Sequence, residues 1–207
     1  MYIVQVTTMR KNLSGNKLLL PEELRFQNVT ESRLTIHEVY DRILNFMASD
    51  PRAAYHFVIG TDSQGFNGYT KFVTGIIIRR MGKGAWACYR QVVVPRELTS
   101  LKEKLTMETA LSQEVAYYFV DGAIQRMEEV LLPFVYQGAS LDLFIDIDAG
   151  TEPTVNKTSL YVEEMIDRVK GMGTYLARVK PDSYAASAYA NRHTKKPVRF
   201  KKRQGLV

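Results

Sequence analysis

The sequence predicts an α/β fold in which five strands form a mixed sheet. Three strand-like segments joined by glycine-containing turns favour antiparallel pairing in the first half of the chain. Strands that alternate with helices favour parallel pairing in the second half, because each crossover then carries a helix. With 207 residues, of which 45% are hydrophobic, the chain can bury the core of one domain.

The first half consists of a predicted helix and an antiparallel meander. Residues 35–38 (Thr-Ile-His-Glu) have the pattern of a capping box, and apolar residues follow at helical spacing until Pro51 disfavours further helix. Asn67-Gly68 and Gly82-Lys83-Gly84 provide the turns of the meander. No Gly-Lys-Ser/Thr sequence opens a helix near Lys83, so these glycines indicate a hairpin turn and not a phosphate-binding loop. The predicted strands are residues 55–62, 71–80 and 85–94.

The second half alternates between helix and strand. Apolar residues occupy the odd positions from Leu141 to Ile147, which is typical of a strand. A later helical pattern, up to residue 170, is ended by Gly171-Met172-Gly173. The predicted elements are a helix over 98–132, a strand over 141–148, a helix from 158 or 159 to 170, a strand over 174–179 and a helix over 183–192.

The positive charge of the chain is concentrated at its C-terminus. We expect an N-terminal arm or extra strand in residues 1–33, one domain in residues 34–194 and a basic tail in residues 195–207. Seven of the 28 basic residues follow Asn191, so residues 1–191 hold 21 basic and 22 acidic residues and are nearly neutral. The tail is either a solvated arm or a contact for the phosphate backbone of a nucleic acid. Its candidate binding residues are Lys195, Lys196, Arg199, Lys201, Lys202 and Arg203.

The chain carries no sequence signal for export or for a membrane. Its one cysteine, Cys88, excludes an internal disulfide, and no Cys/His spacing resembles a zinc site. The first residues lack a basic region followed by an apolar core, and no apolar run approaches the roughly 18 residues of a membrane span. We therefore expect a soluble, cytoplasmic protein without a membrane partner.

Four acidic residues in separate elements predict metal chemistry. Asp62 ends the first predicted strand, Glu108 lies in the long helix, Asp148 ends the fourth strand and Asp182 precedes the last helix. Carboxylate oxygens are the ligands that Mg²⁺ and Mn²⁺ prefer. Sites in open α/β sheets lie at the carboxyl ends of the parallel strands. If the fold brings these acids together, we expect them to hold two Mg²⁺ or Mn²⁺ ions.

For two of these acids the sequence also allows another interpretation: Asp62 could be a turn residue, and Glu114 could be the ligand in place of Glu108. Asp62 is followed by Ser63 and could belong to a turn. Glu108 lies in the middle of the helical stripe that should face the sheet, whereas Glu114 lies about 120° away from it. A charge at the centre of a buried face is costly unless it is paired or binds a metal. Glu108 is therefore the better candidate ligand, and Glu114 is a flanking or solvent-facing residue.

Near the C-terminus the alternatives stay open. Asp146 lies on the same side of its strand as Asp148 and is either a supporting partner of the site or a satisfied structural group. Asp182 is either a ligand or the N-cap of the last helix, a position for which Ser183 competes. His193 either contacts phosphate or is an ordinary surface residue.

Four stretches of the chain resemble the YkuK family of bacterial ribonuclease-H-like proteins. They are residues 55–63 (YHFVIGTDS), 82–88 (GKGAWAC), 108–114 (ETALSQE) and 180–192 (KPDSYAASAYANR). The resemblance covers residues 34–195 and implies a ribonuclease-H-like fold, with a five-stranded mixed sheet and helices on both faces. Strands one to three would be antiparallel and two parallel crossovers would follow. By extension from the wider superfamily, it also implies that Asp62, Glu108, Asp148 and Asp182 hold the catalytic metals.

These observations support two hypotheses of function. The first is a metal-dependent nuclease that cleaves phosphodiester bonds by a two-metal mechanism, with RNA, DNA or a hybrid as its substrate. The alternative is a non-catalytic nucleic-acid-binding or protein-interaction module on the same scaffold, because a fold alone does not assign a function. The sequence does not indicate an oligomeric state.

Overall fold

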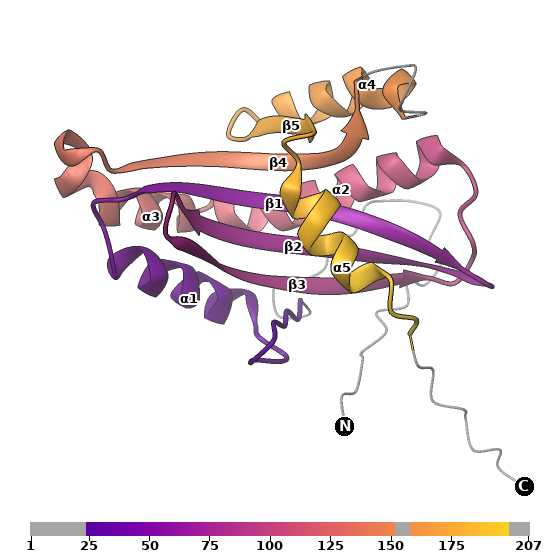
Figure 1. The fold of residues 1–207 in the computed structure, drawn as a ribbon, viewed down its shortest axis with the longest axis horizontal. Helices are drawn as coiled ribbons and strands as arrows, with labels where there is room; N and C mark the ends of the chain where they lie inside the picture. The colour runs from indigo at the N-terminus through magenta and orange to yellow at the C-terminus, as the bar shows by residue number, and fades with distance from the viewer. Residues whose placement is uncertain (1–23, 152–157, 199–207) are drawn as a thin grey trace, which may run out of the picture.

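A five-stranded mixed sheet forms the centre of the protein (Figure 1). In the computed structural model, residues 24–151 and 158–198 are described. The strand order is β3-β2-β1-β4-β5, in which β1, β2 and β3 are antiparallel neighbours and β4 and β5 continue the sheet in parallel with β1. This topology confirms the predicted fold class. The strands are β1 Ala54–Phe66, β2 Tyr69–Arg80, β3 Gly84–Val94, β4 Ser140–Gly150 and β5 Leu176–Lys180.

Helices cover both faces of this sheet. Phe57 and Ile59 of β1 belong to the large core that α1, α2, α3 and α4 form on one face. Val58 points the other way, because side chains alternate along a strand, and packs with Ala185 of η3. In Figure 1 the yellow segment of η3 and α5 crosses the sheet on the side opposite α2. The helices are α1 Ile36–Ala48, α2 Leu101–Val120, α3 Ala123–Leu131, the 3-10 helix η2 Leu132–Gln137, α4 Ser159–Lys170, the π-helix η3 Ala185–Ala190 and α5 Asn191–Thr194.

The first helix is built as its sequence predicts. The Thr35 hydroxyl accepts a hydrogen bond from the backbone N–H of Glu38, and the Glu38 carboxylate accepts one from the backbone N–H of Thr35. This reciprocal pair is the predicted capping box. The helix ends at Ala48, shortly before Pro51.

The first strand is longer than predicted, so the expectation that Asp62 ends it is wrong. β1 stays paired with β2 as far as Phe66 and Tyr69. Only Asn67 and Gly68 separate these two residues, and Gly68 has a φ of 82°, a conformation that suits glycine in a tight hairpin. Asp62 therefore lies within a continuous, rigid strand.

Two predicted helices also differ from the structure. The helix expected over residues 98–132 is interrupted, since Gly122 adopts a φ of 84° between α2 and α3. The helix expected over residues 183–192 begins at Ala185 as a π-helix and continues as α5 to Thr194. Its first N–H, that of Ala185, donates to a carboxylate of the sheet, so the segment is held by a tertiary contact that local sequence does not reveal.

The packed part of the chain starts before residue 34. Leu24 and Phe26 are buried, Phe26 forms a bridge with Leu34, and Gln27 forms a bridge with Tyr89 of β3. The rest of the predicted N-terminal segment, residues 1–23, and the greater part of the predicted tail, residues 199–207, lie outside the described residues. Within the described ranges, no helix has the length and apolar character needed to cross a membrane.

Candidate functional site

The candidate site lies where β1 and β4 stop pairing. The parallel ladder between these strands runs from Ala54 and Ser140 to Gly60 and Asp146. Asp62 follows Gly60 by two residues and points to the same face of the sheet. Asp148 shares this face, because its neighbours Ile147 and Ala149 belong to the core on the opposite face. That is the face on which η3 lies, because a side chain added at Gly60 would meet η3. The two aspartates thus come from neighbouring strands at the carboxyl end of the sheet.

Asp62 is a buried carboxylate without a strong cationic partner. Only 8% of its surface is exposed, and its Oδ2 accepts a hydrogen bond of 2.8 Å from the hydroxyl of Thr194 in α5. The pKa of Asp62 is raised to about 6, mainly by burial and also by the charge of Asp148, while the hydrogen bond from Thr194 acts in the opposite direction. Its environment therefore disfavours the charged form unless a cation is near.

Glu108 approaches this end of β1 from α2, which covers the opposite face of the sheet. Its surface is 9% exposed, and its carboxyl accepts a hydrogen bond from the side chain of Ser63. The pKa of Glu108 is raised to about 8, mainly by burial and also by the charges of Asp62 and Asp148. Ser63 directly follows Asp62, so this contact places the Glu108 carboxyl beside the same part of β1, as its central position on the helical stripe predicts.

Asp148 has a nearby cation but no directed hydrogen bond at its buried oxygen. The ammonium nitrogen of Lys180 lies 3.1 Å from Oδ1 of Asp148, close enough for an ion pair. The same Oδ1 is buried and has no hydrogen bond of acceptable angle in the described structure. The contact between Lys180 and Asp148 is therefore an ion pair without a hydrogen bond, and Oδ1 of Asp148 stays available to a further partner. Lys180 ends β5, beside Gly150 of β4.

Asp146 is committed to the structure of the domain. Its Oδ1 accepts a hydrogen bond of 2.8 Å from Nε of Arg178, and its Oδ2 accepts one of 2.6 Å from the backbone N–H of Ala185. Burial raises the pKa of Asp146 to about 6, and Arg178 and Ala185 oppose that rise. Of the two possibilities that the sequence left open, these contacts favour a structural group that holds the start of η3 on the sheet.

Asp182 is exposed, in the turn between β5 and η3. Its side chain is exposed and, among the described residues, makes no hydrogen bond or ion pair. It does not cap the last helix either, since the cap residue is Tyr184 and no side-chain cap is present. Ser183, the competing cap, is buried with an unpartnered hydroxyl. Asp62, Glu108 and Asp148 thus lie within electrostatic reach of one another, and a metal-binding role stays a prediction for all four acids.

These acids fit a divalent cation in chemical type but are not yet arranged around one. In residues 24–151 and 158–198, no three His, Cys, Asp or Glu side chains form a group ready to ligate an ion. Asp62 and Glu108 are nevertheless buried, Asp148 is partly buried, and Oδ1 of Asp148 has no hydrogen bond. A cation would therefore have to draw the carboxylates closer together, which their mutual repulsion opposes until it binds.

The start of the basic tail is fixed close to this site. The buried ammonium group of Lys71 donates hydrogen bonds of 2.6 Å to the carbonyl of His193 and 2.9 Å to that of Lys196. Lys195 and Lys196 are exposed, and the ring of His193 stacks on Tyr89 with their centroids 3.9 Å apart. The other predicted binding residues, Arg199, Lys201, Lys202 and Arg203, lie outside the described residues.

Sequence reasoning missed three polar groups around the acids. They are the Ser63 side chain on Glu108, the Thr194 hydroxyl on Asp62 and the Lys180 ammonium group beside Asp148. Ser63 directly follows a candidate ligand, which is a usable signal. Lys180 and Thr194 carry none, because their contacts depend on how β5 and α5 are placed.

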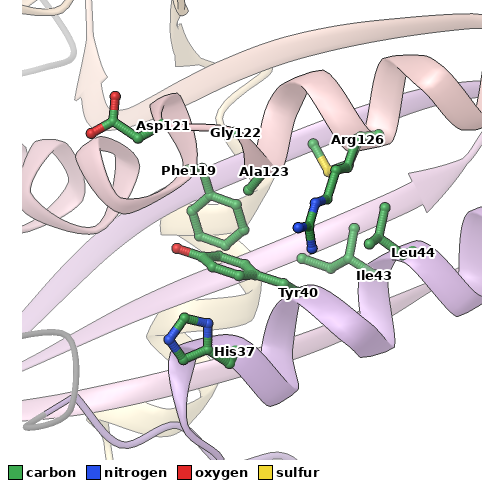
Figure 2. A pocket seen from close by; sticks show the side chains of 10 residues that line it. His37, Tyr40, Ile43, Leu44, Phe119, Asp121, Gly122, Ala123 and Arg126 are labelled. Carbon is green, nitrogen blue, oxygen red and sulfur yellow. The ribbon is translucent and has the colours of Figure 1, made fainter.

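A separate pocket lies at the C-terminal end of α2. It is lined by His37 and Tyr40 of α1, Phe119 of α2, and Arg126 of α3 (Figure 2). Phe119 is 11 residues from Glu108 along α2, or roughly 16 Å at the rise of an α-helix. The pocket is therefore not part of the carboxylate site.

The two glutamates that the sequence offered as alternatives should respond oppositely to neutralisation. Glu108→Gln should stabilise the metal-free protein at pH 9 by on the order of 5 kcal/mol. The pKa of Glu108 is raised from 4.5 to about 8, so the unfolded chain loses this proton first and stability falls as the pH rises between those values. The gain should vanish at pH 4.

Glu114→Gln provides the matched comparison on the same helix. Glu114 forms an ion pair with Arg90, which is only 4% exposed, so its removal leaves a buried guanidinium without a counter-ion. We expect a loss of about 2 kcal/mol, limited because glutamine can still accept a hydrogen bond. Urea unfolding at both pH values measures both variants. Equal signs for the two would contradict the assignment of Glu108 as the unpaired acid.

Comparison with known proteins agrees with this architecture. A model of the family described as Ribonuclease H-like matches residues 38–195. The chain is also 41% identical over 176 residues to a Bacillus subtilis (strain 168) protein called "Uncharacterized protein YkuK", which covers 85% of this chain and 100% of the relative. No solved structure matches the chain. The family points to a nuclease or another nucleic-acid-related role. This chain belongs to the ribonuclease-H-like family, as its own sheet topology, the family match and the similarity to YkuK together show.

Proposed function

We propose that this protein is a divalent-metal-dependent nuclease that hydrolyses phosphodiester bonds. The observation that supports it most is the convergence of Asp62, Glu108 and Asp148 from β1, α2 and β4. Two of these buried acids have a raised pKa, so the cluster is unfavourable by itself and favourable with a cation. Buried acids that repel one another are expected where a metal or a reaction requires them.

In this proposal the three carboxylates hold the cation and the surrounding residues hold the carboxylates. Thr194 orients Asp62, and Ser63 orients Glu108. A bound Mg²⁺ or Mn²⁺ supplies Lewis acidity toward the phosphate and lowers the pKa of an attacking water. Hydrolysis joins the water oxygen to phosphorus and breaks one ester bond, and the leaving oxygen takes up a proton. The expected binding of two ions and the participation of Asp182 stay predictions.

Nucleic acid is the substrate class that the family and the charge distribution favour. The domain is nearly neutral up to residue 191, and the basic residues follow α5 directly, next to the Thr194 contact with Asp62. A tail of this charge attracts the phosphate backbone without reading its sequence, so it suits RNA, DNA and hybrids alike.

A non-catalytic nucleic-acid-binding or protein-interaction module is the second candidate. Two observations favour it: the described acids are not arranged around an ion, and Lys180 already places a positive charge beside Asp148. In that case, binding would persist without metal and would depend mainly on the basic tail.

One experiment separates the two candidates. Wild-type protein is incubated with labelled RNA, DNA, hybrid and branched substrates in Mn²⁺, Mg²⁺ or chelator, and both cleavage and binding are followed over a salt series. We expect cleavage only with metal. Exchange of Arg199, Lys201, Lys202 and Arg203 for glutamine should weaken binding and flatten its salt dependence, with a slope change of up to about 0.9 per lost phosphate contact on duplex DNA. Binding without cleavage of any substrate would favour the module.

A further inference from the structure

We propose that Lys195 and Lys196 form a preformed binding site for the phosphate backbone of a nucleic acid, and that the buried Lys71 is its positioning residue. The two exposed lysines would contact the phosphates, and Lys71 would hold the backbone that carries them. The inference rests on the nucleic-acid partner of the proposed function. It depends neither on metal binding nor on cleavage.

Lys71 is a buried cation whose partners are backbone carbonyls. It lies on β2, only 2% of its surface is exposed, and its ammonium group donates to the carbonyls of His193 and Lys196. Within residues 24–151 and 158–198 it forms no ion pair with a carboxylate. A buried charge is costly unless it is hydrogen-bonded, so this lysine needs the C-terminal segment in place. The contacts therefore tie β2 to the start of the tail.

Two further contacts fix the same part of the chain. The ring of His193 stacks on Tyr89 of β3, with their centroids 3.9 Å apart. The backbone N–H of Val198 donates a hydrogen bond of 3.1 Å to the hydroxyl of Tyr69 of β2. Together with Lys71, these contacts attach residues 193–198, here called the anchored segment, to two strands of the sheet. Its carbonyls at 193 and 196 face Lys71, while the side chains of Lys195 and Lys196 are exposed.

The charges around the anchored segment are positive. The pKa of His193 is lowered, mainly by burial and also by the positive charges of Arg192, Lys71 and Lys196. The pKa of Lys71 is lowered to about 8, mainly by burial and also by the charge of Lys196. In the described part of the chain, Arg192, Lys195 and Lys196 form no ion pair. Such a group of cations attracts a polyanion.

The fixed backbone is what makes Lys195 and Lys196 a site. Basic residues on a free arm lose backbone freedom when they bind a phosphate chain, and this loss weakens binding. In the anchored segment the backbone is already ordered by Lys71. Only the freedom of the two lysine side chains remains to be lost.

Lys71→Met should therefore weaken nucleic-acid binding by about tenfold, which corresponds to the ordering of roughly one residue of backbone. Lys71 is buried and both of its hydrogen bonds go to backbone, so it is not itself a phosphate ligand. The number of phosphate contacts, and with it the dependence of the affinity on salt, should hardly change. The double substitution Lys195→Gln and Lys196→Gln should weaken binding and also flatten the salt dependence, by about 0.7 in slope per lost contact on a single strand.

The test is fluorescence anisotropy of labelled single strands of DNA and RNA, titrated with the full-length protein in chelator over a salt series. Lys71→Met is measured alone and together with Lys195→Gln and Lys196→Gln. We expect no further loss in the combined variant, because Lys71 acts through these two lysines. A lysine that merely stabilised the fold would add its own loss. Lys102→Met removes an exposed charge that pairs with Glu164, and it should bind like wild type.

Tyr69→Phe keeps the test valid if Lys71→Met does not fold, which circular dichroism and urea unfolding will show. This change removes the hydroxyl that accepts from Val198 and leaves Lys71 in place. It should weaken binding in the same direction as Lys71→Met, and again without a change in salt dependence.

The outcomes separate this inference from the proposed function. If wild type binds neither DNA nor RNA, the nucleic-acid partner is wrong and both proposals fall. If wild type binds but does not cleave, the nuclease fails and the role of Lys71 stands or falls by its own variants. If Lys71→Met binds as tightly as wild type, flattens the salt dependence, or adds its loss to that of the two glutamine substitutions, only the role of Lys71 is overturned.

Discussion

Asp62→Asn is expected to abolish metal-dependent cleavage while making the metal-free protein more stable. The activity should fall by at least about a thousandfold, because a catalytic metal supplies several kcal/mol and each 1.36 kcal/mol is a factor of ten. The change keeps the shape of the side chain, and the amide oxygen can still accept the hydrogen bond from Thr194. The loss should therefore come from the missing charge and not from altered packing.

The gain in stability follows from the direction of the pKa shift. The folded protein raises the pKa of Asp62 from 3.8 to about 6, so the unfolded chain loses this proton at lower pH than the folded protein does. Stability then falls as the pH rises between these values, and the whole penalty is present above them. At pH 8, the Asp62→Asn substitution should add about 3 kcal/mol to the free energy of unfolding, and at pH 3 about nothing.

The control for this experiment is another aspartate on the same face of the sheet. Asp142 of β4 is exposed and lies 3.4 Å from the ring nitrogen of His56, away from the carboxylate group. Asp142→Asn should leave both cleavage and metal binding unchanged. If Asp62→Asn retains metal-dependent cleavage, Asp62 is not a ligand. If it lowers the stability at pH 8, the carboxylate is not the desolvated group that its burial implies.

Gly60→Ala should destabilise the domain by about 3 kcal/mol or more, near the upper end of the cost of overpacking. A Cβ at Gly60 would lie 2.7 Å from the backbone nitrogen of Ala186 and 3.1 Å from the backbone carbon of Ala185. These are backbone atoms of η3, and Ala185 is itself bound to Asp146, so η3 cannot give way cheaply. The added methyl group should push η3 off the sheet and loosen Thr194 from Asp62.

Gly65→Ala is the matched control in the same strand. A Cβ there would first meet the end of the Glu97 side chain at 3.4 Å, which can move aside. Its stability should stay within about 1 kcal/mol of wild type. Urea unfolding followed by circular dichroism measures both variants. Equal stabilities for the two would mean that η3 does not pack against β1 as closely as described.

The elements that sequence predicted well are those with local signals. The capping box of Thr35 and Glu38 and the glycine turns at Gly68 and Gly82 act within a few residues, so they can be recognised without knowledge of the fold. The ends of α2 and η3 could not be located in the same way. One depends on the conformation of Gly122, and the other on a hydrogen bond to Asp146 from a residue 39 positions away.

The candidate site was predictable where an element dictates direction. Strand alternation put Asp62 and Asp148 on one face, and the angular position of Glu108 put it toward the sheet, where the structure places it. Lys180 and Thr194 were missed because strand order and helix packing bring them to the acids. Asp182 was assigned through its match to a family pattern, and in this structure it is exposed.

Asp146 and Asp148 lie two residues apart on β4, yet substitution of each would lower catalysis for a different reason. Substitution of Asp148 would remove an oxygen ligand of the ion. Substitution of Asp146 would release Ala185 and with it the segment that carries Thr194. Both variants would look inactive. A mutational scan that measures only turnover would therefore count Asp146 among the metal ligands. Metal affinity and unfolding stability, measured for both variants, would distinguish the structural role of Asp146 from the metal-binding role of Asp148.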